Sequence, residues 1–221
     1  AEKKLGALAL LRNLRGMQVA GVPKAKIAKA LDDMRTDRVL PYRFIAAAQY
    51  APDVEPELEH ATFRSIERHA KLKGKTILLV DVSGSMDGLL SGRSEMRRLD
   101  AACGLAVLAR EICEDVEIYT FSDAVKKVPA RRGFALRDAI VKSQPHMSTY
   151  LGRAVQEVDR KGARLIVFTD EQSHDRVDAP KGLGYMVNVA SYQHGVGHGD
   201  WRRIDGFSEK ILDWIIASEQ G

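Results

Sequence analysis

The 221-residue sequence has few cysteines and no long apolar run. Its two cysteines, Cys103 and Cys113, fall within one segment that we expect to be helical, too far apart along a single helix to bond each other. We interpret both as reduced core thiols, as in a cytoplasmic protein. No secretory signal is recognisable, and no apolar run approaches the length of a membrane span, so we expect no membrane partner.

Low-complexity sequence is also lacking, and the apolar content of 45% is that of a folded protein. Charge is unevenly distributed along the chain. Residues 1–75 contain 15 Lys and Arg against 9 Asp and Glu, whereas residues 76–221 contain 19 against 21. The basic front part could contact phosphates of RNA, or its charges could simply form solvated helix faces; both interpretations stay open.

The most informative stretch is residues 76–87. Five residues, Thr-Ile-Leu-Leu-Val, lead into Asp81-Val-Ser83-Gly-Ser85, which is typical of a buried parallel strand that ends in a polar loop. Three side chains at alternate positions can converge on one side of that loop, and all three offer oxygen ligands. A hard cation such as Mg²⁺ prefers such ligands. The alternative is an ordinary loop whose Asp and Ser cap the next helix.

Before this stretch, apolar residues at helical spacing predict four short helices. Such helices are typical of a small bundle or the end of a helical-repeat array. Because the chain begins within a segment that already has a helical pattern, we expect it to be a fragment of something longer. The four helices are expected over residues 4–17, 23–34, 40–50 and 55–72, followed by a basic linker at 71–75.

After residue 75, strands and helices alternate. This alternation predicts an α/β fold with a doubly wound, mainly parallel sheet, preceded by the all-helical segment at 1–75. Strands are expected at 76–80, 116–121, 124–128, 164–169 and 184–190, and helices at 94–114, 133–143, 150–161 and 206–218.

A second strand repeats the pattern of the first. Arg-Leu-Ile-Val-Phe-Thr leads into Asp170, and between the two aspartates Thr149 lies directly before a predicted helix. Parallel strands of one sheet present their carboxyl ends at one edge, where ligands bind in such folds. We therefore predict that Asp81, Ser83, Ser85, Thr149 and Asp170 form one metal site.

The order Asp-x-Ser-x-Ser, loop Thr before a helix, then strand-Thr-Asp resembles the metal-ion-dependent adhesion site of von Willebrand factor A domains. The resemblance covers residues 76–217 and implies that Ser83, Ser85 and Thr149 bind Mg²⁺ (or Mn²⁺ or Ca²⁺) directly. It implies that the two aspartates bind it directly or through water. One coordination position would be left for a carboxylate from a protein partner.

The front part carries a second resemblance. Its segments at residues 6–15 and 39–44 (Val-Leu-Pro-Tyr-Arg-Phe) are similar to the last helical repeats of the TROVE module of Ro proteins, in which an A domain follows the module. The segment around Gly206 and Ile211–Ile215 resembles the closing helix of that domain. The resemblance implies a ribonucleoprotein that binds non-coding RNA such as Y RNA in RNA quality control, mainly through repeats that this chain lacks.

The sequence also allows other interpretations. A stand-alone A domain would bind a protein carboxylate through Mg²⁺. A Mg²⁺-dependent hydrolase would also use two carboxylates at a sheet edge, but no motif supplies Ser83 with a histidine base, so we expect a binding protein and not an enzyme. His194 and His198 could share zinc on a helix, but the intervening glycines favour a flexible loop. His146 and His174 lie near the predicted site and could contact a ligand or face solvent.

Overall fold

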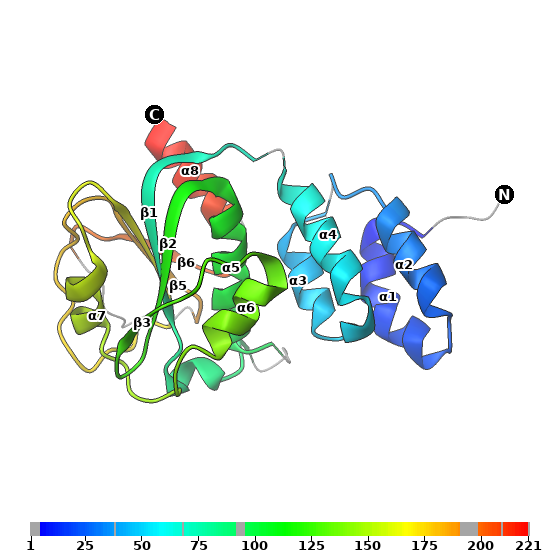
Figure 1. The fold of residues 1–221 in the computed structure, drawn as a ribbon, viewed down its shortest axis with the longest axis horizontal. Helices are drawn as coiled ribbons and strands as arrows, with labels where there is room; N and C mark the ends of the chain where they lie inside the picture. Colours follow the sequence, from blue (N-terminus) through cyan, green and yellow to red (C-terminus); the bar gives the residue numbers. More distant parts are fainter. Residues whose placement is uncertain are drawn as a thin grey trace. The chain divides into compact units, whose positions relative to one another are not determined.

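The computed structural model describes residues 5–37, 39–67, 69–91, 96–190, 199–208 and 210–220. The chain forms two compact units, Ala1–His69 and Ala70–Gly221 (Figure 1). The boundary lies ahead of residue 75 because the segment predicted as a linker is the start of the first strand. Leu72 is buried and already pairs with Cys113.

The first unit consists of helices. In chain order they are α1 (Ala7–Val19), α2 (Lys24–Asp33), α3 (Tyr42–Ala48), the 3₁₀ turn η1 (Pro52–Val54) and α4 (Glu55–Ile66). Their buried faces include Leu14, Leu31, Phe44 and Leu58. The Arg64 side chain on α4 donates to the carbonyls of Leu31 and Asp32 at 2.9 and 2.6 Å, which satisfies acceptors at the end of α2.

The four predicted helices are present, but the fourth is shorter than expected. It ends at Ile66 and not at residue 72. Its apolar pattern merges with the start of the next strand, and periodicity alone does not separate the two.

The second unit is an α/β domain. Its strands are β1 (Leu72–Asp81), β2 (Cys113–Phe121), β3 (Val125–Lys127), β4 (Arg164–Thr169), β5 (Gly184–Asn188) and β6 (Arg202–Asp205). Its helices are the 3₁₀ helix η2 (Gly84–Asp87), α5 (Arg98–Ile112), α6 (Gly133–Val141), α7 (Leu151–Val158) and α8 (Lys210–Gln220). The sheet order is β3-β2-β1-β4-β5-β6, and every neighbouring pair is parallel except β2 and β3.

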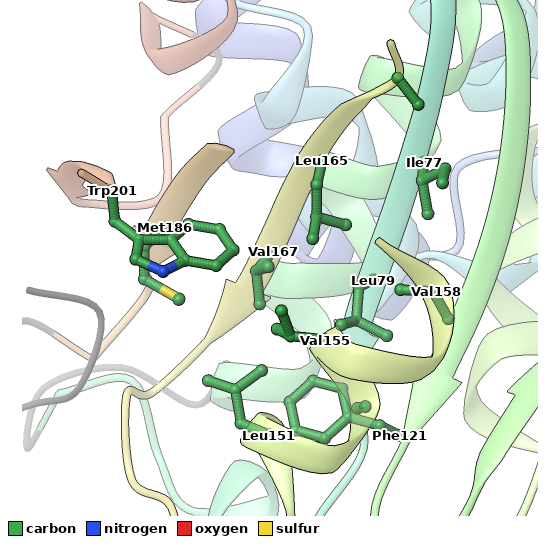
Figure 2. Close-up of a cluster of buried hydrophobic side chains, with 12 residues drawn as sticks. Ile77, Leu79, Phe121, Leu151, Val155, Val158, Leu165, Val167, Met186 and Trp201 are labelled. Atoms are coloured by element: carbon green, nitrogen blue, oxygen red, sulfur yellow. The ribbon is translucent and has the colours of Figure 1, made fainter. Parts of the chain in front are cut away.

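Both faces of the sheet are covered, which confirms the predicted doubly wound fold. Alternate strand residues such as Ile77, Leu79 and Val167 pack with α7 on one face (Figure 2). The residues between them point to the opposite face, where α5 packs on β1 and β4 (Figure 1). Burial on both sides explains why β1 and β4 are continuous apolar runs and not alternating ones.

The strand order reverses between β1 and β4. The chain leaves β1 toward β2 on one side and later returns to β4 on the other side. The carboxyl ends of these two strands therefore flank the crevice where ligands bind in open α/β sheets. Asp81 ends β1, and Asp170 directly follows β4.

Several element boundaries differ from the sequence prediction; α8, for example, is Lys210–Gln220 and not 206–218. Helix α5 begins at Arg98, later than residue 94, and it ends at Ile112 because β2 begins at the next residue. Strand β6 was not predicted. It has four residues, two of them arginine, so it lacks the apolar run of a central strand.

Candidate metal centre

Asp81 lies at the carboxyl end of β1 and is fully buried. Register explains its partners: Val80 pairs with Phe168, so Asp81 and Thr169 are neighbours one position further along. Thr169 Oγ1 donates to Asp81 Oδ2 at 2.7 Å, and the Ser83 backbone N–H donates to Oδ1 at 2.9 Å. The pKa of Asp81 is raised to about 7, because burial and, to a smaller extent, the nearby charge of Asp170 outweigh the hydrogen bonds from Ser83 and Thr169 that lower it.

The two serines converge as their spacing predicts. Ser83 Oγ and Ser85 Oγ lie 3.3 Å apart, with Ser83 buried and Ser85 half-buried. Two ligands on adjacent positions of an octahedral Mg²⁺ site are separated by about 3 Å, so this distance suits a shared cation.

The loop that carries Thr149 is joined to the serine loop by the backbone. Gly84 N–H donates to the Met147 carbonyl at 2.8 Å. Ser122 Oγ accepts from Met147 N–H at 2.8 Å and donates to the Ser148 carbonyl at 3.1 Å. These bonds bring a buried Thr149 to the same end of the sheet as Ser83 and Ser85.

The histidines beside the site bind protein groups. His146 Nδ1 lies 3.1 Å from Asp87 Oδ2, and its Nε2 lies 3.1 Å from the Val141 carbonyl. The backbone N–H of His174 donates to the Thr149 carbonyl at 2.9 Å, and the ring Nδ1 of His174 accepts from the Thr149 backbone N–H at 3.3 Å. Both imidazoles therefore hold the loops of the site in place. The pair His194 and His198 lies outside the described residues.

Asp170 is fully buried and has a cationic partner that sequence reasoning missed. Its Oδ1 accepts from Gln172 N–H at 3.2 Å. Its Oδ2 accepts from Arg98 Nη1 at 3.1 Å. Arg98 is the first residue of α5, and no pattern in the sequence connects it to an aspartate 72 positions later.

A second arginine, whose contact the sequence does not predict, holds the loop after β4. Glu171 has a left-handed backbone with φ of 57° and a fully buried carboxylate. Arg203 on β6 binds both oxygens of that carboxylate, with Nε–Oε1 of 3.0 Å and Nη2–Oε2 of 2.6 Å. Glu171 N–H in turn donates to Thr169 Oγ1 at 3.0 Å, which connects the ion pair to Asp81.

Helix α7 begins against the same loop. Asp175 accepts from the backbone N–H groups of Gly152 and Arg153, both at 2.8 Å, and so caps the helix. Burial raises the pKa of Asp175, but the hydrogen bonds from Ser173, Gly152 and Arg153 outweigh it and lower the pKa overall. The cap fixes Thr149, which lies just before α7, relative to Asp170.

The donor set fits a hard divalent cation. It offers three hydroxyls and two carboxylates from three adjoining loops, and no sulfur or imidazole. Within the described ranges no group of three or more His, Cys, Asp and Glu is placed to hold a metal, as expected for a site whose ligands are mainly hydroxyls. In this structure the guanidinium of Arg98 occupies one oxygen of Asp170, Oδ2.

In the described part of the chain, no helix is long and apolar enough to cross a membrane. The sequence matches no family model and no curated protein.

The structure is similar to the crystal structure of the Deinococcus radiodurans Ro (RSR) protein, with a TM-score of 0.64 and 20% identity. The match covers 92% of this chain and 50% of that chain. A weaker match, to an aerotolerance-related membrane protein from Bacteroides fragilis, has a TM-score of 0.37 and 15% identity and covers 52% of this chain and 67% of that one. This chain thus spans half the length of the Ro protein and shares its fold across both the helical and the α/β unit.

Proposed function

We propose that this chain is part of a Ro-like protein that binds non-coding RNA of the Y RNA type, and that its α/β unit is a non-enzymatic, divalent-cation-binding module. The observation that carries the proposal is the likeness to the Ro protein, because it extends over both units and not over the common α/β fold alone. The oxygen-bearing side chains that gather at the carboxyl ends of β1 and β4 support the metal part independently.

Ser83, Ser85 and Thr149 would hold the cation, together with Asp81 and Asp170. When bound, it would supply an electrophilic position for a carboxylate from a protein partner. Binding and not hydrolysis is supported by the histidines: His146 pairs with Asp87, and His174 with the Thr149 backbone. Within the part of the chain that the structure describes, neither imidazole is bonded to a hydroxyl that could act as a nucleophile.

Mg²⁺ should raise the melting temperature of the purified chain. At about 10 mM Mg²⁺ and a Kd of about 1 mM, mass action contributes about 1.4 kcal/mol. For a unit of this size that is a shift of about 3–6 °C. The gain should disappear in Asp81→Asn, which keeps the size of the buried side chain, and in Asp81→Ala.

The matched control is Asp178→Asn, which removes an exposed carboxylate that accepts from Gln156 Nε2 on α7 and is not a predicted ligand. For each variant, the melting temperature in Mg²⁺ is compared with that of the same variant in EDTA. A change in the intrinsic stability of the variant therefore does not affect the measured gain. A wild type that responds to neither Mg²⁺ nor Mn²⁺, or an Asp81→Asn variant that keeps the full gain, would contradict the metal proposal.

RNA binding by the chain should weaken as salt rises, because phosphate contacts release counterions. Exposed basic residues of the helical unit are expected to make these contacts. The triple variant Arg12→Gln, Lys24→Gln, Lys26→Gln should bind a structured non-coding RNA more weakly, with a shallower slope of log K against log salt, by fluorescence anisotropy.

A second triple variant, Arg131→Gln, Lys142→Gln, Lys161→Gln, removes the same charge from exposed positions of the α/β unit. It should keep most of the affinity. Equal losses in the two variants would mean that RNA responds only to net charge. If the wild-type chain shows no salt-dependent RNA binding, this part of the protein does not contact RNA.

A further inference from the structure

Arg98 places a protein cation inside the candidate metal centre. Its Nη1 lies 3.1 Å from Asp170 Oδ2 and 3.1 Å from the Ser85 carbonyl oxygen. The side chain is 17% exposed, and the carboxylate that it meets is fully buried. These two acceptors belong to loops that carry predicted metal ligands, so the guanidinium lies within the site.

The backbone is shaped to hold this side chain. Arg98 N–H donates to the Gly88 carbonyl at 3.0 Å, which fixes the start of α5 against the serine loop. A Cβ on Gly88 would lie 3.3 Å from Arg98 Cζ and 3.2 Å from the Ser85 carbonyl oxygen. Gly88 has ordinary extended backbone angles, with φ of −66° and ψ of 153°. Glycine therefore serves here to leave room for the guanidinium.

The ion pair between Arg98 and Asp170 affects how a metal can bind. A buried carboxylate without a cation is costly, and Asp170 is buried next to a second carboxylate, Asp81. Arg98 neutralises Asp170 when no metal is bound. A divalent cation on the same carboxylate would lie within a few ångströms of the guanidinium, where like charges repel strongly because little water screens them.

We infer that Arg98 is a resident cation that competes with the divalent metal for Asp170, so that metal binding requires the guanidinium to leave this carboxylate. The inference rests on the metal site proposed above and adds a regulator to it. Arg98 stabilises the metal-free site and lowers its metal affinity, so the site fills only when metal binding outweighs the loss of the ion pair.

The test compares Mn²⁺ affinities, measured from the electron paramagnetic resonance of free Mn²⁺, in the whole chain and its variants. Arg98→Gln should bind Mn²⁺ about tenfold more tightly than wild type, while its melting temperature in EDTA falls. Arg98→Lys keeps the charge and should stay closer to wild type. The control is Arg97→Gln, which removes a neighbouring, exposed arginine that faces Asp87 at 3.6 Å and should leave the Mn²⁺ affinity unchanged.

A second measurement does not depend on Arg98→Gln, in case that variant does not fold. The side-chain Nε–H resonance of Arg98, assigned from its absence in Arg98→Lys, should shift during a Mg²⁺ titration with the same midpoint as binding. A resonance that does not move at saturating Mg²⁺, or an Arg98→Gln affinity no tighter than that of a metal-binding wild type, overturns the competition. If neither wild type nor Arg98→Gln binds Mn²⁺, the metal site itself is wrong.

Discussion

Replacing Gly152 with alanine should destabilise the α/β unit by about 3 kcal/mol or more, at the upper end of the cost of overpacking. A Cβ at this position would lie 1.9 Å from the carbonyl oxygen of Arg176, 2.8 Å from its carbonyl carbon and 3.0 Å from Asp175 Cγ. Two of these three atoms are backbone and cannot move away by a rotamer change. Either α7 or the loop that follows β4 must shift.

Both movements are costly. Helix α7 contributes Leu151, Val155 and Val158 to the core beneath the sheet (Figure 2). The loop contributes Asp175, which caps the same helix. A shift of either element therefore separates groups that are bonded or packed in the native state, and it moves Thr149 away from Asp170.

Chemical denaturation followed by tryptophan fluorescence measures this loss directly. The two tryptophans, Trp201 and Trp214, both belong to the α/β unit, so the signal does not report on the helical unit. The control is Gly16→Ala on α1, where a Cβ meets nothing within 4 Å. Followed by circular dichroism, that variant should stabilise the helical unit by up to about 1 kcal/mol. If the denaturation midpoint of Gly152→Ala is close to that of the wild type, the loop after β4 moves aside with little loss of stability.

The parts of the site that could be predicted from sequence are those that strand pattern dictates. Asp81 and Asp170 each follow a buried apolar run, and parallel strands bring such ends together whatever the rest of the chain does. Ser83 and Ser85 follow from the alternation within one short loop. These predictions needed local sequence and one rule of sheet geometry.

The arginines could not be predicted in this way. Arg98 and Arg203 meet carboxylates 72 and 32 positions away, on elements whose spatial order is fixed only by packing. Strand β6, which presents Arg203, is a short edge strand without an apolar run. Most of the basic stretch that is predicted as a linker belongs to β1, because it pairs with β2 from Leu72 onward. Its charges have partners: Lys75 pairs with Glu117, and Lys71, just before the strand, donates to the Glu111 carbonyl.

Replacing Arg203 with methionine should cost about 3–5 kcal/mol of stability, because it leaves the buried carboxylate of Glu171 without its cation. Methionine fills much of the same volume, so the loss reports mainly on charge. The control is Arg202→Met on the same strand, an exposed arginine that contacts Tyr185 and Ser218 and should cost less than about 1 kcal/mol.

The double variant Arg203→Met, Glu171→Gln separates charge from packing. Replacing the Glu171 carboxylate, which has lost its cation in Arg203→Met, should restore a large part of the lost stability. The measurement is the same fluorescence-detected denaturation. If the double variant is no more stable than Arg203→Met, the arginine acts through packing and not through its ion pair. Because Glu171 N–H donates to Thr169 and Thr169 donates to Asp81, Arg203→Met should also weaken Mn²⁺ binding relative to Arg202→Met. The edge strand would then help to position the metal centre without contributing a ligand to it.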